Sequence, residues 1–445
     1  MEERYNLKEN VYFPYKFPEI WNKVEKMFKS EIKSIQDLNN VFFQGKSNFF
    51  KQLEISFPED GQKFLKVFNN ISKLVLSLKN IFPNDEFEIL KSKTTDKLIL
   101  TRRKVALIFI LGFFDIFAID IEKTNIQIRY TFFEILDSTD GPCFNKGRCF
   151  LNYMTVIGNW LEEDNPKLNE LITYIRENVN INNQNFDIIK KLCDVEIVLQ
   201  GSMFDTKASF CVDFANKYIG GGALKRGCVQ EEILFAVEPE AVVSMFFMEK
   251  MEDNDAIRID NLIQYSKYSG YARSFKYEES AINDKEFIIH NIIAIDAVKV
   301  LSSGGVDKES VIRDLMKAYV GFNLINFDDN DVSKLEKTIA TGNWGCGAFG
   351  GDYELKFIQQ LLAATYAGVD KLYYYTFGRK EMDNVVANLE KIKSLNAKDL
   401  YEKMIKAELK KGKVLDIILI KDINNTNDNQ ENKEKSCFEK LCKIS

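Results

Sequence analysis

Two adjacent carboxylic acids follow a run of glycines in the middle of the chain. The run Gly220–Gly222 is followed, eight residues later, by the triplet Gln230–Glu232. Without Cβ atoms, backbone N–H groups can approach an anion closely, and positive φ angles become accessible. A carboxyl group beside such a loop could act as a general acid or base on a phosphate-bearing ligand. The pattern fits equally well a flexible turn before a helix whose acidic first turn suits the helix dipole.

A second glycine-rich loop occupies Thr341–Asp352, T-G-N-W-G-C-G-A-F-G-G-D. It holds five glycines in twelve residues between a predicted strand and a predicted helix, an arrangement in which N–H groups and a helix N-terminus hold a diphosphate. No G-K-[ST] follows, so this is not a Walker A loop, and the pattern is not G-x-G-x-x-G. A plain loop is the alternative, but turns seldom need so many glycines. We expect Trp344 and Phe349 to lie where they could contact a ligand.

The composition excludes several kinds of site. His290 is the only histidine in 445 residues, so a zinc-protease motif or any site with two histidine ligands is excluded. It lies in the apolar run F-I-I-H-N-I-I-A-I, where we expect a core or strand-end residue. Acid–base chemistry therefore falls to carboxylates, tyrosine or lysine, and we expect no metal and no redox cofactor.

The net charge and the cysteines of the chain indicate which partners it can bind and in which kind of cellular compartment it folds. A chain with a net charge of −6 is a poor candidate for non-specific nucleic-acid binding, so we expect no direct nucleic-acid partner. A polyanionic ligand would have to be held by a local site. The chain has eight cysteines, no C-x-x-C motif and no signal-like N-terminus, which predicts free thiols in a reducing compartment.

Strands alternate with helices after about residue 190, which predicts an α/β fold whose sheet is covered on both faces. The predicted strands are Val195–Leu199, Phe210–Val212, Glu286–Val298, a strand from Ile339 into the glycine-rich loop, and Lys371–Phe377. The predicted helical segments are Glu231–Met251, Lys308–Tyr319 with Asp307 as its cap, Glu354–Ala367, Asn384–Lys393 and Ala397–Lys410.

The residues before about 185 are predicted to be mostly helical, with few strands. The predicted helices are Gln62–Ile81, Asp96–Ala118, Cys149–Leu161 and Pro166–Asn178. The apolar run Val105–Ile121 is short for a membrane span and carries Asp115 and Asp120, so we expect a buried core helix. We divide the chain into a helical accessory domain (1–185), an α/β domain (186–420) and a disordered polar tail (421–445).

Several segments resemble one known family, in the same order along the chain. G-G-G-A-L-K-R-G-C-V-Q-E-E is similar to the signature of poly(ADP-ribose) glycohydrolases, as are D-F-A-N before it and the second glycine-rich loop after it. Further matches are Tyr265–Phe275, Ala294–Ala297 and Lys317–Phe322 and, more weakly, T-R-R-K-V-A-L-I-F-I-L-G-F-F and R-C-F-L-N-Y-M. The resemblance covers roughly residues 80–380.

The resemblance implies a macrodomain-like mixed sheet sandwiched by helices, preceded by a mostly helical accessory domain. It implies hydrolysis of O-glycosidic ribose–ribose bonds in poly(ADP-ribose), with release of ADP-ribose. Glu232 matches the general acid/base, which must be protonated when the bond breaks; burial and repulsion from Glu231 would favour that state. We expect Glu231 to hold ribose hydroxyls, because an adjacent pair cannot flank the bond as the two acids of ordinary glycosidases do.

The resemblance also implies a set of substrate-binding residues. Those around the first loop and the acidic pair are Asp213, Asn216, Gly220, Gly221, Gly222 and Gln230. Those of the opposing diphosphate loop are Asn343, Gly345, Cys346, Gly347, Ala348, Phe349 and Gly350. Tyr271 matches a tyrosine that closes over the ligand, and Phe377 an aromatic near its adenine and ribose end. Phe204 stands where the family often has an acidic residue, so the chain departs from the pattern at the adenine contacts.

The expected partners are poly(ADP-ribose), ADP-ribose and poly(ADP-ribosyl)ated proteins, with the protein acting as a monomer. The resemblance implies that the protein is located in the nucleus, the cytoplasm or both, and that it takes part in the DNA damage response. The C-terminal C-K-I-S fits a farnesylation box at Cys442, which would allow membrane association, and Cys437 could carry a second lipid. Against this, Lys443 is not aliphatic and the upstream region is not polybasic.

Three other functions are compatible with the sequence. A non-catalytic ADP-ribose reader could share the fold, although such modules usually lack the Q-E-E triplet. A hydrolase of protein-linked mono-ADP-ribose would use a similar site. A scaffold could act through the helical half and the acidic surface.

Overall fold

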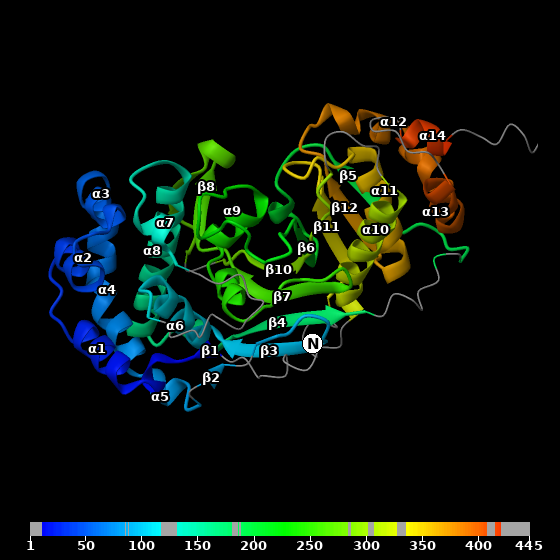
Figure 1. Ribbon diagram of the computed structural model, residues 1–445. Coiled ribbons are helices and arrows are strands. Elements are labelled where there is room, and N and C mark those ends of the chain that lie inside the picture. Colours follow the sequence, from blue (N-terminus) through cyan, green and yellow to red (C-terminus); the bar gives the residue numbers. More distant parts are fainter. Residues whose placement is uncertain are drawn as a thin grey trace, which may run out of the picture.

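A mixed sheet of eight strands organises the molecule (Figure 1). The computed structural model describes residues 11–84, 86–87, 89–116, 131–179, 186, 188–283, 286–300, 307–326, 335–406 and 414–419. The strand order is β3 (Asp96–Thr101), β4 (Leu171–Asn178), β7 (Asp255–Ile263), β10 (Ile289–Ala294), β6 (Phe210–Asp213), β11 (Thr338–Gly342), β12 (Lys371–Tyr375) and β5 (Asp194–Val198). From β10 to β5 the neighbouring strands are parallel, whereas β3, β4 and β7 are joined to each other and to β10 in antiparallel pairs.

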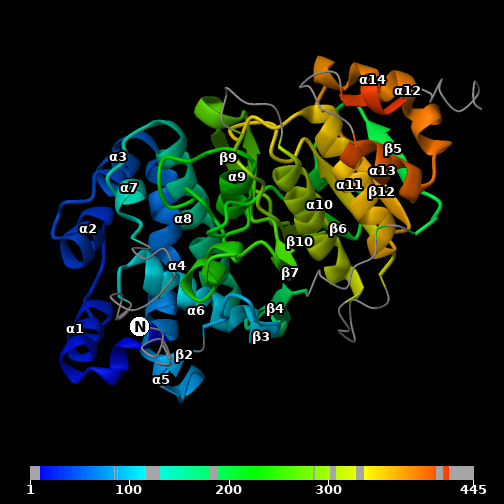
Figure 2. The same ribbon diagram turned by 45° about the vertical axis from the view of Figure 1, so that its right-hand side comes forward.

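Helices cover both faces of this sheet, as predicted for an α/β fold. In β10, Ile292 belongs to an apolar core shared with the N-terminal helices, whereas the next residue, Ile293, belongs to a core shared with α10 (Lys308–Asn323) and α11 (Tyr353–Ala367). This alternation follows from the two-residue period of a strand. Figure 2 shows α10 and α11 side by side.

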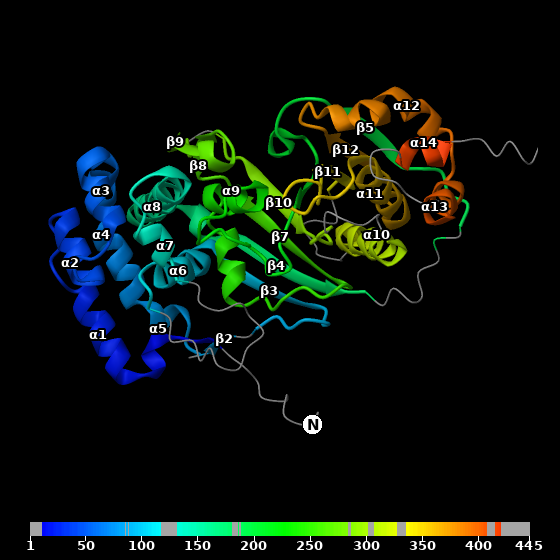
Figure 3. The same cartoon turned by 45° about the horizontal axis from the view of Figure 1, so that its top comes forward.

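Apart from α9 (Gln230–Val237), which lies near the middle, the remaining helices gather toward the two ends of the molecule (Figures 1 and 3). At one end lie α1 (Pro18–Phe28), α2 (Ile35–Phe43), α3 (Asn48–Ser56), α4 (Pro58–Leu76), α5 (Leu78–Ile81), α6 (Arg102–Phe113), α7 (Phe133–Leu136) and α8 (Gly141–Glu162). At the other lie α12 (Asp383–Lys393), α13 (Ala397–Lys406) and α14 (Val414–Leu419). Two small sheets complete the fold: β1 (Val11–Tyr12) with β2 (Glu86–Phe87), and β8 (Ser266–Ser269) with β9 (Lys276–Ser280).

Two N-terminal predictions are wrong. The segment Pro166–Asn178 is not a helix, because a short 3-10 turn leads directly into β4. Since β4 pairs on both sides and has apolar residues on both faces, its sequence lacks the alternation of a half-exposed strand. The helix predicted from Asp96 begins only at Arg102, after β3, where the Thr101 hydroxyl accepts a hydrogen bond from the N–H of Lys104.

Strands β3 and β4 therefore belong to the central sheet although they precede residue 185. Our prediction of few strands before residue 185 is therefore wrong for β3 and β4. The sheet continues across the predicted boundary at 185, and the division into domains stays a prediction.

The other element predictions agree with the structure apart from their ends, and the end of the helix predicted over Ala397–Lys410, from residue 407, lies outside the described residues. Helix α10 begins after Asp307, whose carboxylate accepts a hydrogen bond from the N–H of Ser310 at 2.8 Å. The helix predicted over Glu231–Met251 is shorter, because α9 (Gln230–Val237) ends before Pro239 and a 3-10 segment, Ala241–Phe246, follows. Predicted helices Gln62–Ile81 and Cys149–Leu161 lie within α4–α5 and α8.

Helix α6 is buried along almost its whole length, as predicted for a core helix. Among the described residues, no helix combines the length and apolarity needed to cross a membrane. The helix ends at Phe113, earlier than predicted, since residues 114–116 are not helical. Residues 117–121, the tail 421–445 and both C-terminal cysteines lie outside the described residues.

Candidate active site

The predicted site residues gather at one edge of the sheet. Asp213 ends β6 and Gly342 ends β11, and these two strands are parallel neighbours. Tyr375 ends β12, which is parallel to β11, and Phe377 follows two residues later. Because parallel strands present their carboxyl ends at the same edge, residues far apart in sequence meet there.

Glu232 lies in the first turn of α9, with both carboxyl oxygens held by backbone N–H groups. Its Oε1 accepts a hydrogen bond from Gly222 at 3.0 Å, and its Oε2 accepts one from Val229 at 2.8 Å. The Val229 contact is half of a capping box, in which the third helical residue reaches back to the residue before the helix. Glu232 is 8% exposed, so its carboxyl group is almost enclosed between the glycine loop and the helix start.

Glu231 holds the other end of the same loop. Its Oε1 accepts a hydrogen bond from the N–H of Gly220 at 2.6 Å, and its Oε2 accepts one from Asn216 at 2.9 Å. Burial, and then the nearby carboxyl groups of Asp213 and Glu232, raise the pKa of Glu231 well above its ordinary value. The two adjacent glutamates thus clamp the loop from residue 216 to residue 222 against α9.

The loop needs glycine because it lies directly against these carboxyl groups. Gly221 has φ +47°, and a Cβ there would lie 2.6 Å from Glu231 Oε2 and 2.9 Å from Glu232 Oε1. At Gly227, a Cβ would lie 2.7 Å from the same Glu232 oxygen. The run of glycines therefore serves close approach as well as backbone conformation.

Asp213 is a buried acid beside this pair. Its side chain is inaccessible to solvent, and neither carboxyl oxygen has a hydrogen-bond partner among the residues that the structure describes. Burial, and then the negative charges of Glu232 and Glu238, raise the pKa of Asp213 well above its ordinary value.

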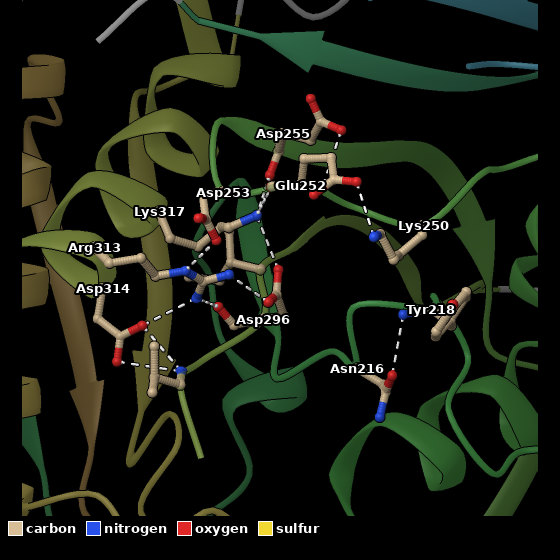
Figure 4. Close-up of polar contacts among 12 residues, drawn as sticks. Asn216, Tyr218, Lys250, Glu252, Asp253, Asp255, Asp296, Arg313, Asp314 and Lys317 are labelled. Carbon is tan, nitrogen blue, oxygen red and sulfur yellow. Dashed lines mark hydrogen bonds and ion pairs between the residues drawn. The ribbon is translucent and has the colours of Figure 1, made fainter. Parts of the chain in front are cut away.

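Gln230 and Asn216 fix the backbone around the acids. The Gln230 amide accepts a hydrogen bond from the N–H of Phe214 at 2.8 Å and donates one to the carbonyl of Val212 at 3.1 Å. The Asn216 side chain accepts a hydrogen bond from the N–H of Tyr218 at 3.0 Å (Figure 4). The predicted contacts of these residues with ligand stay predictions.

The second glycine-rich loop lies between β11 and α11, as predicted. Gly345 and Gly350 have φ +73° and +71°, and Gly347 and Ala348 are exposed at its tip, with Phe349 partly buried beside them. The Asn343 amide donates to the carbonyl of Thr376 at 3.0 Å, which ties the loop to the end of β12. Backbone N–H groups can thus reach a ligand at the tip.

Two side chains of this loop point into the protein. Trp344 is 1% exposed and donates its indole N–H to the carbonyl of Ile295 at 2.9 Å, so our expectation that it could contact a ligand is wrong. Cys346 is also buried, so a ligand contact there would have to use its backbone. A tryptophan in a glycine-rich loop can anchor the loop to the core, and the sequence alone did not distinguish this from an exposed ring.

A buried ion network behind the second loop was missed by the sequence reasoning (Figure 4). Asp296 pairs with Arg313 at 2.6 Å and with Lys317 at 2.9 Å. Asp314 pairs with Arg313 at 3.0 Å and with Lys356, whose ammonium lies 4.1 Å from the ring centroid of Trp344. The signals were the matched motifs A-I-D-A and K-A-Y-V-G-F, to which we assigned no role.

Two exposed aromatic side chains lie near this edge. Tyr271, in the turn between β8 and β9, is 56% exposed; partial burial raises the pKa of its hydroxyl, which the nearby backbone of Gln230 opposes. Phe377 is 48% exposed and has φ +53°, a left-handed conformation that bulky residues rarely adopt. Such strain often accompanies a functional site. Contact of either ring with a ligand stays a prediction.

His290 lies in β10 and is 6% exposed, which confirms the expected core position. Its Nε2 donates to the carbonyl of Phe204 at 2.8 Å, and its Nδ1 contacts Glu238 at 2.5 Å. Burial opposes a charge on this ring, but the Glu238 carboxylate outweighs burial and raises the His290 pKa. Among the described residues, no three His, Cys, Asp or Glu side chains are grouped so as to hold a metal ion.

Two protein-family models match the chain. The one described as poly (ADP-ribose) glycohydrolase (PARG), Macro domain fold, matches residues 182–384. The one described as poly (ADP-ribose) glycohydrolase (PARG), helical domain, matches residues 55–176. The two matched ranges together account for most of the chain and agree with the mixed sheet and the helical N-terminal part seen here.

Individual proteins with these names are also similar. "Probable poly(ADP-ribose) glycohydrolase 2" of Arabidopsis thaliana is 27% identical over 454 residues, which cover 86% of this chain and 85% of that protein. "Poly(ADP-ribose) glycohydrolase 1" of Caenorhabditis elegans is 36% identical over 211 residues, which cover 44% of this chain but only 26% of that protein. A crystal structure of poly(ADP-ribose) glycohydrolase from Deinococcus radiodurans in complex with ADP-ribose is 14% identical, with a TM-score of 0.31, over 46% of this chain and 86% of that one. On the two family models and the acidic, glycine-rich site that they span, the chain belongs to the poly(ADP-ribose) glycohydrolase family.

Proposed function

We propose that this protein hydrolyses the O-glycosidic ribose–ribose bonds of poly(ADP-ribose) and releases ADP-ribose, with Glu232 as the general acid and base. The observation that carries the proposal is the placement of Glu232. Its carboxyl group lies at the carboxyl edge of the sheet, at the start of α9, in contact with a loop of glycines. The family membership supplies the substrate class.

The reaction follows from a single carboxyl group acting twice. Glu232 donates its proton to the oxygen of the leaving ribose as the bond from that oxygen to the anomeric carbon breaks. The anomeric carbon is left as an oxocarbenium ion. Glu232, now a carboxylate, removes a proton from the attacking water, whose oxygen bonds to the anomeric carbon. The products are a free ribose hydroxyl on one side and ADP-ribose on the other.

The neighbouring groups hold the substrate and the acid in place. Backbone N–H groups of the first loop and of the tip of the second would bind the diphosphate between them. Burial raises the pKa of Asp213, which disfavours a further negative charge next to this anion. Glu231 holds the first loop through Asn216 and Gly220, and its role toward ribose hydroxyls is part of the proposal.

A panel of substrates tests the proposed specificity. Purified protein should release ADP-ribose from poly(ADP-ribose) and act far more slowly on mono-ADP-ribose linked to a protein side chain. Faster release from the protein-linked monomer would reassign the chain to that reaction. No release from either substrate, with ADP-ribose still binding by calorimetry, would make it a reader.

The cellular setting is part of the same proposal. We propose poly(ADP-ribosyl)ated proteins as partners, action as a monomer, a place in the nucleus, the cytoplasm or both, and a role in the DNA damage response. The farnesylation box at Cys442 lies outside the described residues. Mass spectrometry of the protein from its native cell decides this point, because an unmodified C-terminus there would exclude the lipid.

A further inference from the structure

A buried lysine of the helical N-terminal part reaches the catalytic glycine loop. Lys146 lies on α8 and its side chain is inaccessible to solvent. Its Nζ lies near four backbone carbonyl oxygens of one loop: those of Gly222 at 3.2 Å, Ala223 at 2.8 Å, Lys225 at 2.7 Å and Gly227 at 2.5 Å.

This contact requires a charged or strongly donating group. An ammonium has three N–H donors and no acceptor, and a buried one is costly unless carbonyl or carboxylate groups surround it. Burial lowers the pKa of Lys146, although nearby acidic groups, among them Cys143, Cys228 and Glu232, oppose this. Carbonyl groups converging from one loop replace the water that the ammonium has lost.

The same contact fixes which way the loop faces. Gly222 donates its N–H to Glu232 Oε1 at 3.0 Å, while its carbonyl points to Lys146. The N–H groups of Ala223 and Lys225 are bonded within the loop, to the carbonyls of Gly220 and Gly222, so the peptide of Gly222 is the one that joins Lys146 to Glu232. A small rotation of these peptides would move the Gly222 N–H away from Glu232.

Helix α8 also holds the turn that carries Tyr271. The Asn145 side chain accepts a hydrogen bond from the N–H of Tyr277 at 3.1 Å, in β9. The Asn152 amide donates to the carbonyl of Tyr265 at 2.8 Å, just before β8. One helix thus supports both the catalytic loop and the hairpin beside it.

We propose that Lys146 is a positioning residue for the reaction, through which the helical N-terminal part sets the conformation of the loop from Gly222 to Gly227. Its effect on turnover rests on the proposed function, whereas its effect on the loop does not. The helical part is accordingly a scaffold for the active site, and its removal would impair the site even if the sheet still folded.

Hydrogen exchange and kinetics on Lys146→Met test this proposal. We expect faster exchange of the loop amides between residues 218 and 229, and a fall in kcat on the order of 100-fold, as for a small misplacement of a reacting group. ADP-ribose affinity should fall by a smaller factor. Lys104→Met is the matched control, since Lys104 belongs to the same helical part but lies over the ring of Phe82, 5.2 Å from its centroid. The control should leave loop exchange and kcat unchanged.

A second variant separates positioning from general support of the fold. In Lys146→Ala, ethylammonium should restore part of kcat and of the loop protection, whereas tetramethylammonium, which has no N–H donor, should restore neither. Unchanged loop exchange in Lys146→Met, or faster exchange throughout the chain rather than at the loop, would overturn the proposal. If the wild-type protein released no ADP-ribose, the proposed function would fail, and loop exchange and ADP-ribose binding would still decide the role of Lys146.

Discussion

Single side chains in this site make several hydrogen bonds at once. Glu231 and Glu232 each use both carboxyl oxygens to hold backbone N–H groups, three of them in the glycine loop and one at Val229, so the acids organise the loop that we propose holds the substrate. Because the loop and the two carboxyl groups are so close, there is no room for a Cβ at Gly221. The sequence showed the glycines and the acids, but it did not show that they touch.

Replacing Gly221 should disturb the acids more than the fold. In Gly221→Ala the new Cβ would clash with Glu231 and Glu232, so we expect ADP-ribose release to fall about 100-fold. Gly368→Ala is the control, because Gly368 also has a positive φ, +77°, but nothing lies within 4 Å of its Cβ position. Both variants should lose about 1 kcal/mol of unfolding free energy from the backbone alone. Equal activities in the two variants would contradict the close packing described here.

Asp213 should make the folded protein less stable as the pH rises. The pKa of Asp213 in the folded state lies above the unfolded value of about 3.9. The contribution of Asp213 to the unfolding free energy is therefore fully present below about pH 4 and is lost as the pH rises through the folded-state pKa. Glu231 acts in the same direction. We therefore expect Asp213→Asn to raise the melting temperature at pH 8 and to leave it almost unchanged at pH 4.

Asp307 provides the control, because its contribution to stability changes with pH in the opposite direction. Hydrogen bonds from Ser310 lower the pKa of Asp307, so its contribution is present above the unfolded pKa and is lost as the pH falls. Asp307→Asn should lower the melting temperature slightly at pH 8. A lower melting temperature of Asp213→Asn at pH 8 would show that Asp213 is ionised and paired in the folded state.

The helices and strands were predictable where one face is exposed. Helix α10 has a start capped by Asp307 and a partly exposed face, so its apolar periodicity is visible in the sequence. Strand β4 was missed because it lies between two other strands and is apolar on both faces. The contact of Lys146 with the loop was missed because nothing in a lone lysine on a helix indicates which distant carbonyls it will meet.

Helix α8 depends on close contact with α4. A Cβ at Gly158 would lie 2.5 Å from Cβ of Val67, so Gly158→Ala should lower the unfolding free energy by about 1–3 kcal/mol despite alanine's better helix propensity. Asn159→Ala, an exposed position on the same helix, should change it by less than about 0.5 kcal/mol. Chemical denaturation measures both. A Gly158→Ala protein as stable as the wild type would show that the two helices can separate without cost.

In the whole molecule, a sheet edge and a helical scaffold build one site. The sheet places Asp213, the second glycine-rich loop and Phe377 at its carboxyl edge, while α8 holds the first loop from the other side through Lys146. The motifs were enough to predict the fold class, and they are the basis on which we propose Glu232 as the acid. The packing of the N-terminal strands and the ion network of Asp296, Arg313 and Lys317 required the structure.

The most direct test is the initial rate of ADP-ribose release from poly(ADP-ribose) by Glu232→Gln beside the wild-type protein, with ADP-ribose binding measured on both. We predict a rate at least about 100-fold lower for the variant, since it cannot donate or accept the proton, with ADP-ribose still bound. Near-normal release by Glu232→Gln would contradict the assignment and move the acid to another carboxyl group, with Glu231 the next to test.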